Sequence, residues 1–561
     1  CSDKTGTLTQ NRMTVRQLVL SEHNYFLEGD GYDLSGEITE NGHPAVVCKE
    51  LRMLLNCAVL CNNARLAPNT NEDLIGDPTE LALLVAAEKA GIHSEQVISH
   101  YTKIDEDPFD SIKKYMTVTV RTLDGKTLLF MKGAPDIILG RCAKIACSGE
   151  EKFLNRQCRS EVIEQNEKMA KKALRVIGFA VKEIAGWHAD KNEQDFTFLG
   201  LAGMIDPPRK EAKKAIKLCC KAGIRTVMIT GDHKETAAAI ASEIGIFTAG
   251  DLAVTGADLD QMSDQQLQER LEKISVYARV SPEHKIRIVE AWQKKGHITA
   301  MTGDGVNDAP ALKKADIGIA MGKAGTEVSR DAAAMILTDD NFATIIKAVA
   351  NGRNVYRNIK NSIQFLLSGN MAGILCVLYT SIKALPLPFA PVHLLFINLL
   401  TDSLPAIAIG MEPADRDLLN QPPRDPKEGI LSFPFAGKIL FQGFLIGAAT
   451  MWAWEMGYSQ GGEAIASTMA FSALTLARLF HGFNCRSSHS LLSLGIRSNM
   501  WSVMAFETGT LLLAAVLFLP GLQALFAVAD LSVRQLAAVL VCAFVPTLVL
   551  QSAKMLAEAV S

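Results

Sequence analysis

Apolar residues are unevenly distributed along this 561-residue chain. Up to about residue 345, short apolar runs alternate with polar, helix-like stretches, as in soluble α/β domains. From about residue 362 onward, long apolar runs dominate, and six of them approach the roughly 20 residues that a helix needs to cross a bilayer. They lie near residues 362–382, 390–410, 436–456, 464–484, 501–520 and 535–555. The pattern predicts a soluble part, a helical stalk at 346–361 and a membrane part at 362–561 with six helices.

The soluble part contains two different patterns. The first, over residues 13–196, mixes strand-like runs at 115–121 and 127–132 with helical periodicity at 47–61 and 78–90. From Phe198 onward strands alternate with helices, with strands at 198–204, 226–230, 297–302 and 315–320 and a helix at 210–222. Such alternation predicts a parallel, doubly wound sheet. We therefore expect an α/β domain made of residues 1–12 and 197–345, with an α+β domain at 13–196 inserted into it.

Composition excludes some classes of function. The net charge of −3 argues against a nucleic-acid binder, which usually carries a basic face. The twelve cysteines show no paired metal-binding spacing, so scattered reduced thiols are the simpler interpretation.

Three polar motifs stand at the ends of predicted strands. Active sites of doubly wound sheets lie beyond the carboxyl ends of the strands, and Asp3, Thr230 and Asp304 each fall at such an end. Asp3 begins the polar loop 3–7, and a carboxylate there can attack the γ-phosphorus of ATP. Lys4 can neutralise oxygen charge, and Gly6 lets backbone N–H groups approach a phosphoryl group. Taken alone, this loop is also compatible with a simple turn after a buried strand.

Four motifs together resemble those of P-type ATPases, most closely the bacterial members of the calcium-pump branch. They are Asp3-Lys-Thr-Gly-Thr-Leu-Thr, Lys132-Gly-Ala-Pro, Thr230-Gly-Asp and Thr302-Gly-Asp-Gly-Val-Asn-Asp. The resemblance covers essentially the whole chain. It implies a haloacid-dehalogenase-like phosphorylation domain, an inserted nucleotide-binding domain and a six-helix transmembrane bundle. It also implies ATP-driven Ca²⁺ transport through an aspartyl phosphate, by a multi-pass protein of a bacterial cell membrane.

The resemblance further implies sequence upstream of Cys1. Family members carry an actuator domain and four transmembrane helices there, and the strand that should lead into Asp3 is absent from this sequence. We therefore expect this chain to be the C-terminal part of a pump. It would be either a fragment or one piece of a split chain, whose other half would then be a partner.

The resemblance assigns roles to residues around Asp3. Asp3 and Asp304, helped by the Thr5 carbonyl, would hold Mg²⁺, while Asp308 would hold Asp304 or a metal-bound water. The phosphoryl group would be bound by Lys4, Thr230, Gly231, Lys285 and Asn307. Thr5 stands where related soluble phosphatases usually carry an aspartate that acts as general acid. The lack of this aspartate would slow hydrolysis of the aspartyl phosphate, so the phosphoenzyme could last long enough to be coupled to movement.

The nucleotide site is expected in the inserted domain and in the gap beside it. By resemblance, Phe109 would stack on adenine, Glu80 and Lys132 would line the base pocket, and Arg175 would reach the phosphates. Further candidate contacts to phosphate, ribose or Mg-ATP are Lys114, Asp206 and Asp232. Taken singly, Phe109 is more often a core residue and Arg175 a surface charge. Ser111 stands where many calcium pumps carry arginine, which puts that contact in doubt.

Polar residues in the membrane segments predict the ion path. Asn370 lies in the first segment, and Asn398, Thr401 and Asp402 lie in the second. Asn398 and Asp402 are four residues apart and would share a helix face, and Pro405 would free the Thr401 carbonyl as an oxygen ligand. Such a set suits Ca²⁺. By positive-inside logic, the loops that carry Arg424 and Arg486 lie on the cytosolic side.

Two departures from pumps that carry two Ca²⁺ ions bear on stoichiometry. Gly373 replaces a glutamate, and Arg478 stands near the place of another carboxylate. Arg478 would supply a fixed positive charge in place of the second ion, which predicts one Ca²⁺ per ATP with H⁺ countertransport. Alternatively, Arg478 is a structural partner of a carboxylate.

Three competing interpretations of function follow from the sequence. The chain could belong to a P-type pump for another cation, such as Mn²⁺, Na⁺ or H⁺. It could also be an incomplete fragment that binds nucleotide but transports nothing. A soluble phosphatase is opposed by the six membrane segments.

Overall fold

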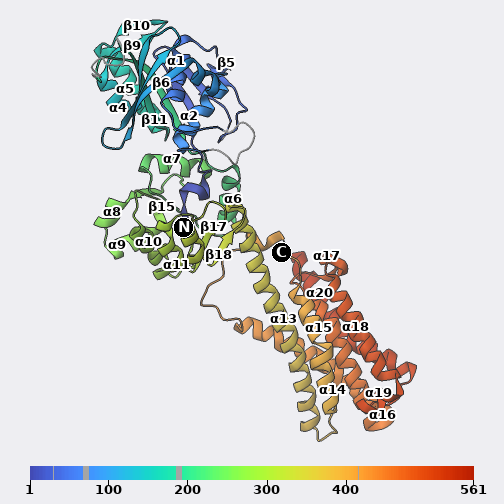
Figure 1. Ribbon diagram of the computed structural model, residues 1–561. Coiled ribbons are helices and arrows are strands. Elements are labelled where there is room, and N and C mark those ends of the chain that lie inside the picture. Colours follow the sequence, from blue (N-terminus) through green and yellow to red (C-terminus); the bar gives the residue numbers. More distant parts are fainter. Residues whose placement is uncertain (30, 67–74, 185–192, 415, 561) are drawn as a thin grey trace. The chain divides into compact units, whose positions relative to one another are not determined.

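The computed structural model describes residues 1–29, 31–66, 75–184, 193–414 and 416–560. The chain divides into two compact units. The first contains Cys1–Cys220 and Ile224–Ile346, and the second contains Lys221–Gly223 and Lys347–Ser561. Strands and helices alternate in the first unit, whereas the second is helical (Figure 1).

A seven-stranded sheet in the first unit contains the N-terminal strand at its centre (Figure 1). Its strand order is β14 (Leu252–Thr255), β15 (Ile274–Ala278), β13 (Met228–Ile229), β1 (Ser2–Asp3), β16 (Ala300–Gly303), β17 (Ile317–Met321) and β18 (Met335–Leu337). Every strand pair is parallel, and Ser2 pairs with Met228 on one side and Thr302 on the other. The helices that connect these strands are α6 (Lys210–Lys221), α7 (Lys234–Ile244), α8 (Gly256–Gln261), α9 (Asp264–Arg270), α10 (Pro282–Lys294), α11 (Ala309–Lys314) and α12 (Glu327–Ala332). The predicted parallel sheet is confirmed.

A second, eleven-stranded sheet contains both antiparallel and parallel pairs. Its main path runs β5 (His43–Pro44), β4 (Ile38–Glu40), β3 (Asn24–Leu27), β2 (Thr14–Val19), β12 (Phe196–Ile205), β11 (Arg175–Ile184), β8 (Thr127–Gly133), β7 (Tyr115–Thr122) and β6 (Tyr101–Asp110). Off this path, β9 (Cys142–Cys147) pairs with β12 and with β10 (Glu150–Phe153). The accompanying helices are α1 (Lys49–Leu60), α2 (Pro78–Lys89), α3 (Ser94–His100), α4 (Pro135–Arg141) and α5 (Arg156–Lys171).

The predicted hairpin and the two predicted helices of this region are confirmed. The hairpin is β7 and β8, and the helices are α1 and α2. Pro78 occupies the first turn of α2, and the Asp77 carboxylate accepts the Thr79 N–H at 2.8 Å as an N-cap.

The assignment of the strand at 198–204 to the parallel sheet is wrong. This strand is β12, which pairs antiparallel with β11 and β2 in the second sheet. Leu199 and Ala202 pack into one hydrophobic core, and Phe198 and Leu201 pack into the core on the other face. A strand buried on both faces has the continuous apolar sequence that is typical of a parallel sheet, so the pattern alone does not distinguish the two cases.

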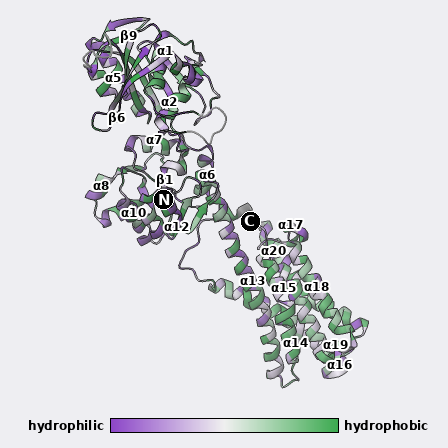
Figure 2. Ribbon diagram, in the orientation of Figure 1, coloured by the Kyte–Doolittle hydropathy of each residue, from purple (hydrophilic) through white to green (hydrophobic). Residues whose placement is uncertain are grey.

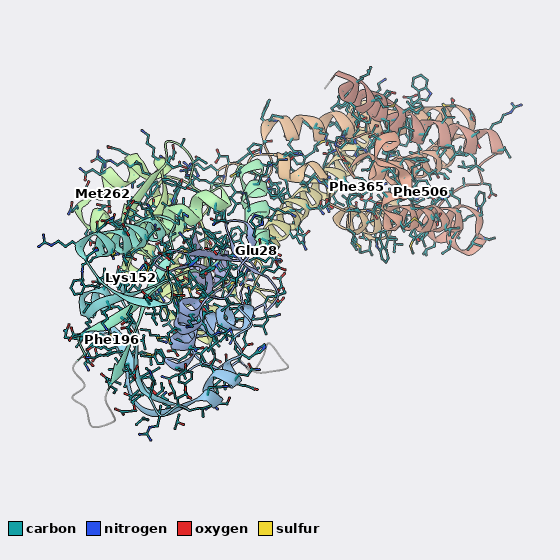
Figure 3. The ribbon with its side chains drawn as sticks, turned by 90° about the horizontal axis from the view of Figure 1, so that it is seen from above. Glu28, Lys152, Phe196, Met262, Phe365 and Phe506 are labelled. Atoms are coloured by element: carbon teal, nitrogen blue, oxygen red, sulfur yellow. The ribbon has the colours of Figure 1, made fainter. Side chains whose placement is uncertain are left out.

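The second unit is formed by helices whose apolar residues are prominent (Figure 2). They are α13 (Phe342–Ile382), α14 (Pro391–Phe396), η4 (Ile397–Thr401), α15 (Ser403–Gly410), α16 (Phe433–Asn484), α17 (Leu491–Leu494), α18 (Met500–Phe518), α19 (Pro520–Phe526) and α20 (Val533–Val560). Trp454, Phe471 and Phe396 lie in its main hydrophobic core. Phe365 of α13 and Phe506 of α18 also lie in this unit (Figure 3).

Within the described residues, five helical segments are long and apolar enough to cross a membrane, where the sequence predicts six. The predicted third and fourth segments are both contained in the 52-residue helix α16. Gly461 and Gly462 have non-helical backbone within it, which divides α16 into two arms. The predicted stalk and first membrane segment are one continuous helix, α13.

Candidate functional site

The loop after β1 forms a tight turn over Lys4–Leu8. The Asp3 carboxylate accepts the Lys4 N–H at 2.6 Å. Gly6 has a φ of 69°, in the left-handed region, and a Cβ placed on it would lie 2.2 Å from Asp304 Oδ2. Gly6 therefore permits both the turn and the close approach of Asp304.

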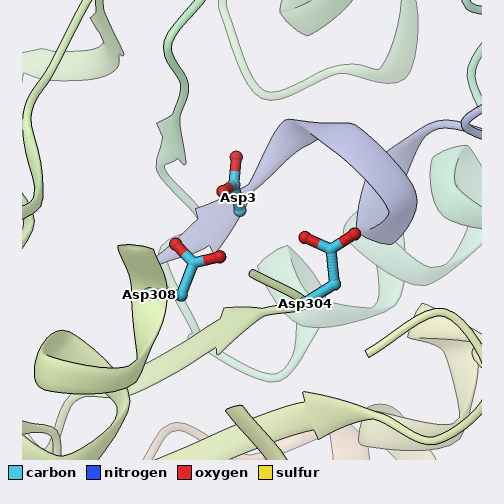
Figure 4. Close-up of side chains that lie close together, drawn as sticks. All are labelled: Asp3, Asp304 and Asp308. Carbon is cyan, nitrogen blue, oxygen red and sulfur yellow. The ribbon is translucent and has the colours of Figure 1, made fainter. Parts of the chain in front are cut away.

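Three carboxylates gather at the carboxyl ends of the central strands. Asp3 ends β1, Asp304 directly follows β16, and Asp308 precedes α11 (Figure 4). One ligand oxygen from each lies within 4.8 Å of the others. The Gly305 N–H donates to Asp308 at 3.0 Å, which orients that side chain. Three oxygen ligands with at least two charges suit a hard divalent cation, so the residues present fit Mg²⁺.

Lys285, in the first turn of α10, links two of these carboxylates. Its ammonium lies 2.7 Å from Asp3 and 2.5 Å from Asp308, and all three side chains are buried. Burial alone would lower the pKa of Lys285, but the carboxylates of Asp3 and Asp308 raise it above its ordinary value. Lys285 thus supplies positive charge inside the cluster.

Ionisation of the Asp3 and Asp304 carboxylates is electrostatically unfavourable in this cluster. Burial raises the pKa of Asp3 to about 7, although Lys285 opposes the shift, and Asp308 adds to it. Burial and Asp308 also raise the pKa of Asp304 to about 6. A site with this excess of buried negative charge favours the binding of a cation.

Lys4 points to a different pair of carboxylates. Its ammonium lies 2.6 Å from Asp232, which follows Thr230 and Gly231 after β13, and 3.9 Å from Asp206. The Asp232 N–H donates to the Thr230 hydroxyl at 3.2 Å. Thr230 is buried, whereas Asn307 is exposed at the surface. Lys4 therefore contacts the carboxylate cluster through its backbone N–H, while its ammonium pairs with Asp232 and Asp206 outside the cluster.

A cleft of about 790 Å³ in the first unit lies beside this loop. Of the predicted site residues, it is lined by Lys4, Thr5, Arg175, Asp206 and Asp232. Arg175 is exposed and donates to the Thr79 hydroxyl at 3.2 Å. With Lys171, the cleft is lined by three cationic side chains, and five carboxylates line it as well: Asp77, Glu167, Asp206, Asp232 and Glu235.

The other predicted nucleotide residues do not line the cleft. Lys132 and Glu80 form an ion pair of 2.7 Å. Phe109 is 60% exposed on β6. The Lys114 carbonyl accepts the Ala134 N–H at 2.9 Å, and a Cβ on Gly133 would lie 2.5 Å from that carbonyl. The motif at 132–135 is thus packed against the turn at Lys114.

Sequence reasoning missed Arg209, which holds the Asp3 loop. Its guanidinium donates to the Gly6 carbonyl at 2.9 Å and to the Thr9 carbonyl at 3.0 Å. The Thr9 hydroxyl in turn donates to Asp206 at 2.5 Å. Arg209 and Asp206 are about 200 positions from the loop in the sequence, so no local pattern could reveal these contacts.

The predicted ion site of the second unit is centred on an ion pair. Arg478 of α16 pairs with Asp402 and donates to the Asn370 side chain at 3.1 Å. Arg478 and Asp402 are both buried. A Cβ on Gly369 would lie 2.4 Å from Arg478 Nε, so this glycine makes room for the guanidinium. The contact agrees with the alternative interpretation of Arg478 as the partner of a carboxylate.

Asn398 and Asp402, predicted to share a helix face, differ in exposure. Asn398 is exposed, whereas Thr401 and Asp402 are buried. A π-helical turn spans Ile397–Thr401, in which the Asp402 N–H donates to the Ile397 carbonyl, five residues back, at 2.9 Å. The backbone there is therefore not the regular α-helix that the spacing of four assumes.

Three family models match separate parts of the chain. Residues 50–211 match the P-type ATPase cytoplasmic domain N, residues 284–349 match haloacid dehalogenase-like hydrolases, and residues 386–556 match the C-terminus of cation transporting ATPases. With the carboxylate cluster at the edge of a parallel sheet, these matches define the class. The chain belongs to the P-type ATPases, as its motifs predicted.

Several curated relatives of this chain are calcium-transporting ATPases. The chain is 44% identical to the calcium-transporting ATPase of Bacillus subtilis, over 94% of this chain and 60% of that protein. It is also 44% identical to calcium-transporting ATPase 1 of Lactococcus lactis, over 94% of this chain and 58% of that protein. For the human calcium-transporting ATPase type 2C member 1, identity is 37% over 96% of this chain and 58% of that protein. The chain thus spans about 60% of the length of these curated relatives, and it is a multi-pass membrane protein.

Proposed function

We propose that this chain contains the phosphorylation site, the nucleotide site and part of the ion path of a P-type Ca²⁺-transporting ATPase. In the whole protein, ATP would phosphorylate Asp3, and the resulting cycle would move Ca²⁺ across a membrane. The observation that carries this proposal is the contact of Lys285 with Asp3 inside a cluster of three carboxylates. A lysine held against the attacked carboxylate is suited to neutralise a phosphoryl group attached there.

We propose that Asp3, Asp304 and the Thr5 carbonyl hold Mg²⁺, with Asp308 orienting Asp304 or a bound water. When bound, Mg²⁺ supplies positive charge to the phosphoryl oxygens. Lys285 keeps the Asp3 carboxylate oriented before transfer and pairs with the phosphate afterwards. The hydroxyl of Thr230, the backbone at Gly231 and the Asn307 amide would bind the remaining phosphoryl oxygens.

ATP would occupy the cleft beside the Asp3 loop. Its phosphates and ribose would meet Lys4, Arg175, Asp206 and Asp232, which line that cleft. Adenine would reach the surface around Phe109, Lys114 and the Glu80–Lys132 pair. The proposed domain boundaries remain 1–12 and 197–345 for phosphorylation and 13–196 for nucleotide binding, except that β12 belongs to the second sheet.

In the membrane unit, Ca²⁺ would be bound by Asn370, Asn398, Thr401 and Asp402. We propose that Arg478 occupies the place of a second ion, which gives one Ca²⁺ per ATP with H⁺ countertransport. The two arms of α16 would cross the membrane separately, because a helix of 52 residues would extend about 78 Å against a hydrocarbon core of about 30 Å. We further propose that the chain crosses the membrane six times, that residues 346–361 form a stalk, and that the membrane is a bacterial cell membrane.

A second candidate is a pump for another cation, such as H⁺, Na⁺ or Mn²⁺. The observation in its favour is the Asp402–Arg478 pair, which leaves little net negative charge to attract a divalent ion.

Acid-stable ³²P labelling from [γ-³²P]ATP tests the proposal, in a protein of the relatives' length that contains this chain. Label that requires Ca²⁺ is expected, and Asp3→Asn should abolish it. Asp124→Asn, at an exposed turn, is the matched control and should keep the label. If the label needs Asp3 but responds to another cation instead of Ca²⁺, that other cation is the transported ion. Label that survives Asp3→Asn would overturn the assignment of the phosphorylated residue.

A further inference from the structure

Asp340 is a buried aspartate outside the carboxylate cluster. It lies three residues after β18, is 6% exposed and has a φ of 51°. Its carboxylate accepts three backbone N–H groups from one loop. Oδ1 accepts those of Gly322 at 2.7 Å and Lys323 at 2.9 Å, and Oδ2 accepts that of Ala324 at 2.7 Å. Charge-assisted bonds of this kind are roughly twice as strong as neutral ones, so Asp340 fixes the conformation of this loop.

The loop is residues 322–326, between β17 and α12, and we call it the brace loop. Its glycines allow its backbone to lie directly on the neighbouring strands. A Cβ on Gly322 would lie 2.7 Å from the Leu337 carbonyl, and one on Gly325 would lie 2.1 Å from the Met321 carbonyl. The brace loop therefore has little room to adopt another path.

The far end of the brace loop holds Asp304. The Thr326 N–H donates to the Asp304 carbonyl at 2.8 Å. The Ser329 hydroxyl lies 3.1 Å from the same oxygen and 2.8 Å from the Thr326 carbonyl, and its single proton is shared between the two. Ser329 is fully buried, so its hydroxyl has no competing water. The Thr326 N–H, supported by Ser329, thus fixes the backbone of a residue whose carboxylate belongs to the cluster.

We propose that Asp340 is a positioning residue for Asp304. Asp340 fixes the brace loop, the brace loop fixes the Asp304 backbone through Thr326 and Ser329, and Asp304 is thereby held ready for Mg²⁺. This inference rests on the proposed role of Asp304 as a Mg²⁺ ligand. Preorganisation of a ligand by groups behind it is a common determinant of metal affinity, worth 10–100-fold by order of magnitude.

The test measures the affinity of the purified full chain in detergent for Mg²⁺ alone, by isothermal titration calorimetry. Asp340→Asn preserves size and tolerates the left-handed backbone, but its amide nitrogen has no lone pair for the Ala324 N–H. Its Mg²⁺ dissociation constant should rise about tenfold or more. The affinity for ADP in the absence of Mg²⁺ should stay within about twofold, because Asp340 does not line the cleft.

Ser329→Ala tests whether Mg²⁺ affinity depends on the position of Asp304 rather than on the negative charge of Asp340. It removes the hydroxyl whose proton is shared between the Asp304 and Thr326 carbonyls, without altering any charge, and it should weaken Mg²⁺ binding severalfold. Asp251→Asn is the matched control. Asp251 also accepts a backbone N–H, from Thr248 at 2.8 Å, but it precedes β14 at the opposite edge of the sheet. That variant should keep the Mg²⁺ affinity of the parent chain.

The outcomes separate the two proposals. If Asp304→Asn binds Mg²⁺ as well as the parent chain does, the proposed Mg²⁺ site is wrong. If Asp304→Asn loses Mg²⁺ but Asp340→Asn and Ser329→Ala retain it, the positioning role is wrong and Asp340 only stabilises the fold. Reduced Mg²⁺ affinity in both variants, with unchanged ADP affinity, supports the role of the brace loop.

Discussion

Replacing Lys285 by methionine should destabilise the chain strongly at pH 8. The ammonium lies 2.7 Å from Asp3 and 2.5 Å from Asp308, and the three side chains are 6%, 9% and 2% exposed. Methionine fills most of the volume but leaves two buried carboxylates without a counter-charge. Removing one partner of a buried pair costs about 3–5 kcal/mol. We therefore expect the free energy of unfolding of the variant to fall by about this amount.

The loss should depend on pH in a defined direction. The pKa of Asp3 is about 7 in the folded chain against an ordinary value of 3.8. Between these values the folded state binds more protons than the unfolded state, so ionisation of Asp3 lowers stability as the pH rises. Without Lys285, the opposing positive charge is lost and the pKa of Asp3 moves higher still. The difference in stability between parent and variant should therefore be larger at pH 8 than at pH 6.

Thermal unfolding in detergent at both pH values, with and without Mg²⁺, measures this effect. Added Mg²⁺ should recover part of the loss because it supplies positive charge to the same carboxylates. Lys4→Met is the matched control. The Asp232 side chain that pairs closely with Lys4 is 35% exposed, so water can solvate it, and the buried Asp206, 3.9 Å from the ammonium, keeps its bond from the Thr9 hydroxyl. The loss should therefore be smaller than for Lys285→Met. The reasoning is refuted if Lys285→Met is no less stable than Lys4→Met at pH 8, or if the loss is unchanged at pH 6.

Three further changes test individual contacts. Gly6→Ala should cost about 1–2 kcal/mol for its left-handed backbone and also displace Asp304. Its Mg²⁺ affinity in calorimetry should therefore fall more than its stability suggests, and an unchanged affinity would contradict the geometry. Arg209→Ala removes two charge-assisted bonds from the Asp3 loop and should lower the free energy of unfolding by about 3 kcal/mol, measured by thermal unfolding. In the whole protein, Arg478→Glu should change the number of Ca²⁺ ions bound in equilibrium ⁴⁵Ca²⁺ measurements. One Ca²⁺ bound with unchanged affinity and turnover would remove the support for a fixed charge.

The proximity of the residues at the strand ends could be predicted because the topology of a parallel sheet constrains where those ends lie. Parallel strands place their carboxyl ends at one edge, so Asp3, Thr230 and Asp304 had to lie near one another once the strands were recognised. Helix α2 could be predicted because Asp77 and Pro78 are local signals. In both cases the information lies in short sequence segments whose geometry is nearly fixed.

Other features depend on partners that are distant in the sequence. Nothing near Lys4 indicates that it pairs with Asp232 and Asp206 rather than with the carboxylate cluster. Strand β12 was placed in the wrong sheet because burial on both faces hides whether its neighbours are parallel. The spacing of four between Asn398 and Asp402 assumes an α-helix, whereas the backbone there forms a π-helical turn.

Buried charge in the membrane unit limits how an ion can bind. Arg486, expected in a loop, is fully buried and holds Glu412 by two bonds of 2.9 Å, while Asn499 donates to the same carboxylate. Glu412 is thus fully engaged, whereas one oxygen of Asp402 has no partner among the described residues. That free oxygen favours Asp402 over Glu412 as the ion ligand. Since Arg478 already balances the charge of Asp402, a bound Ca²⁺ would leave two positive charges in excess. Binding must therefore bring further carboxylates or move Arg478 away, and Arg478→Glu tests that requirement.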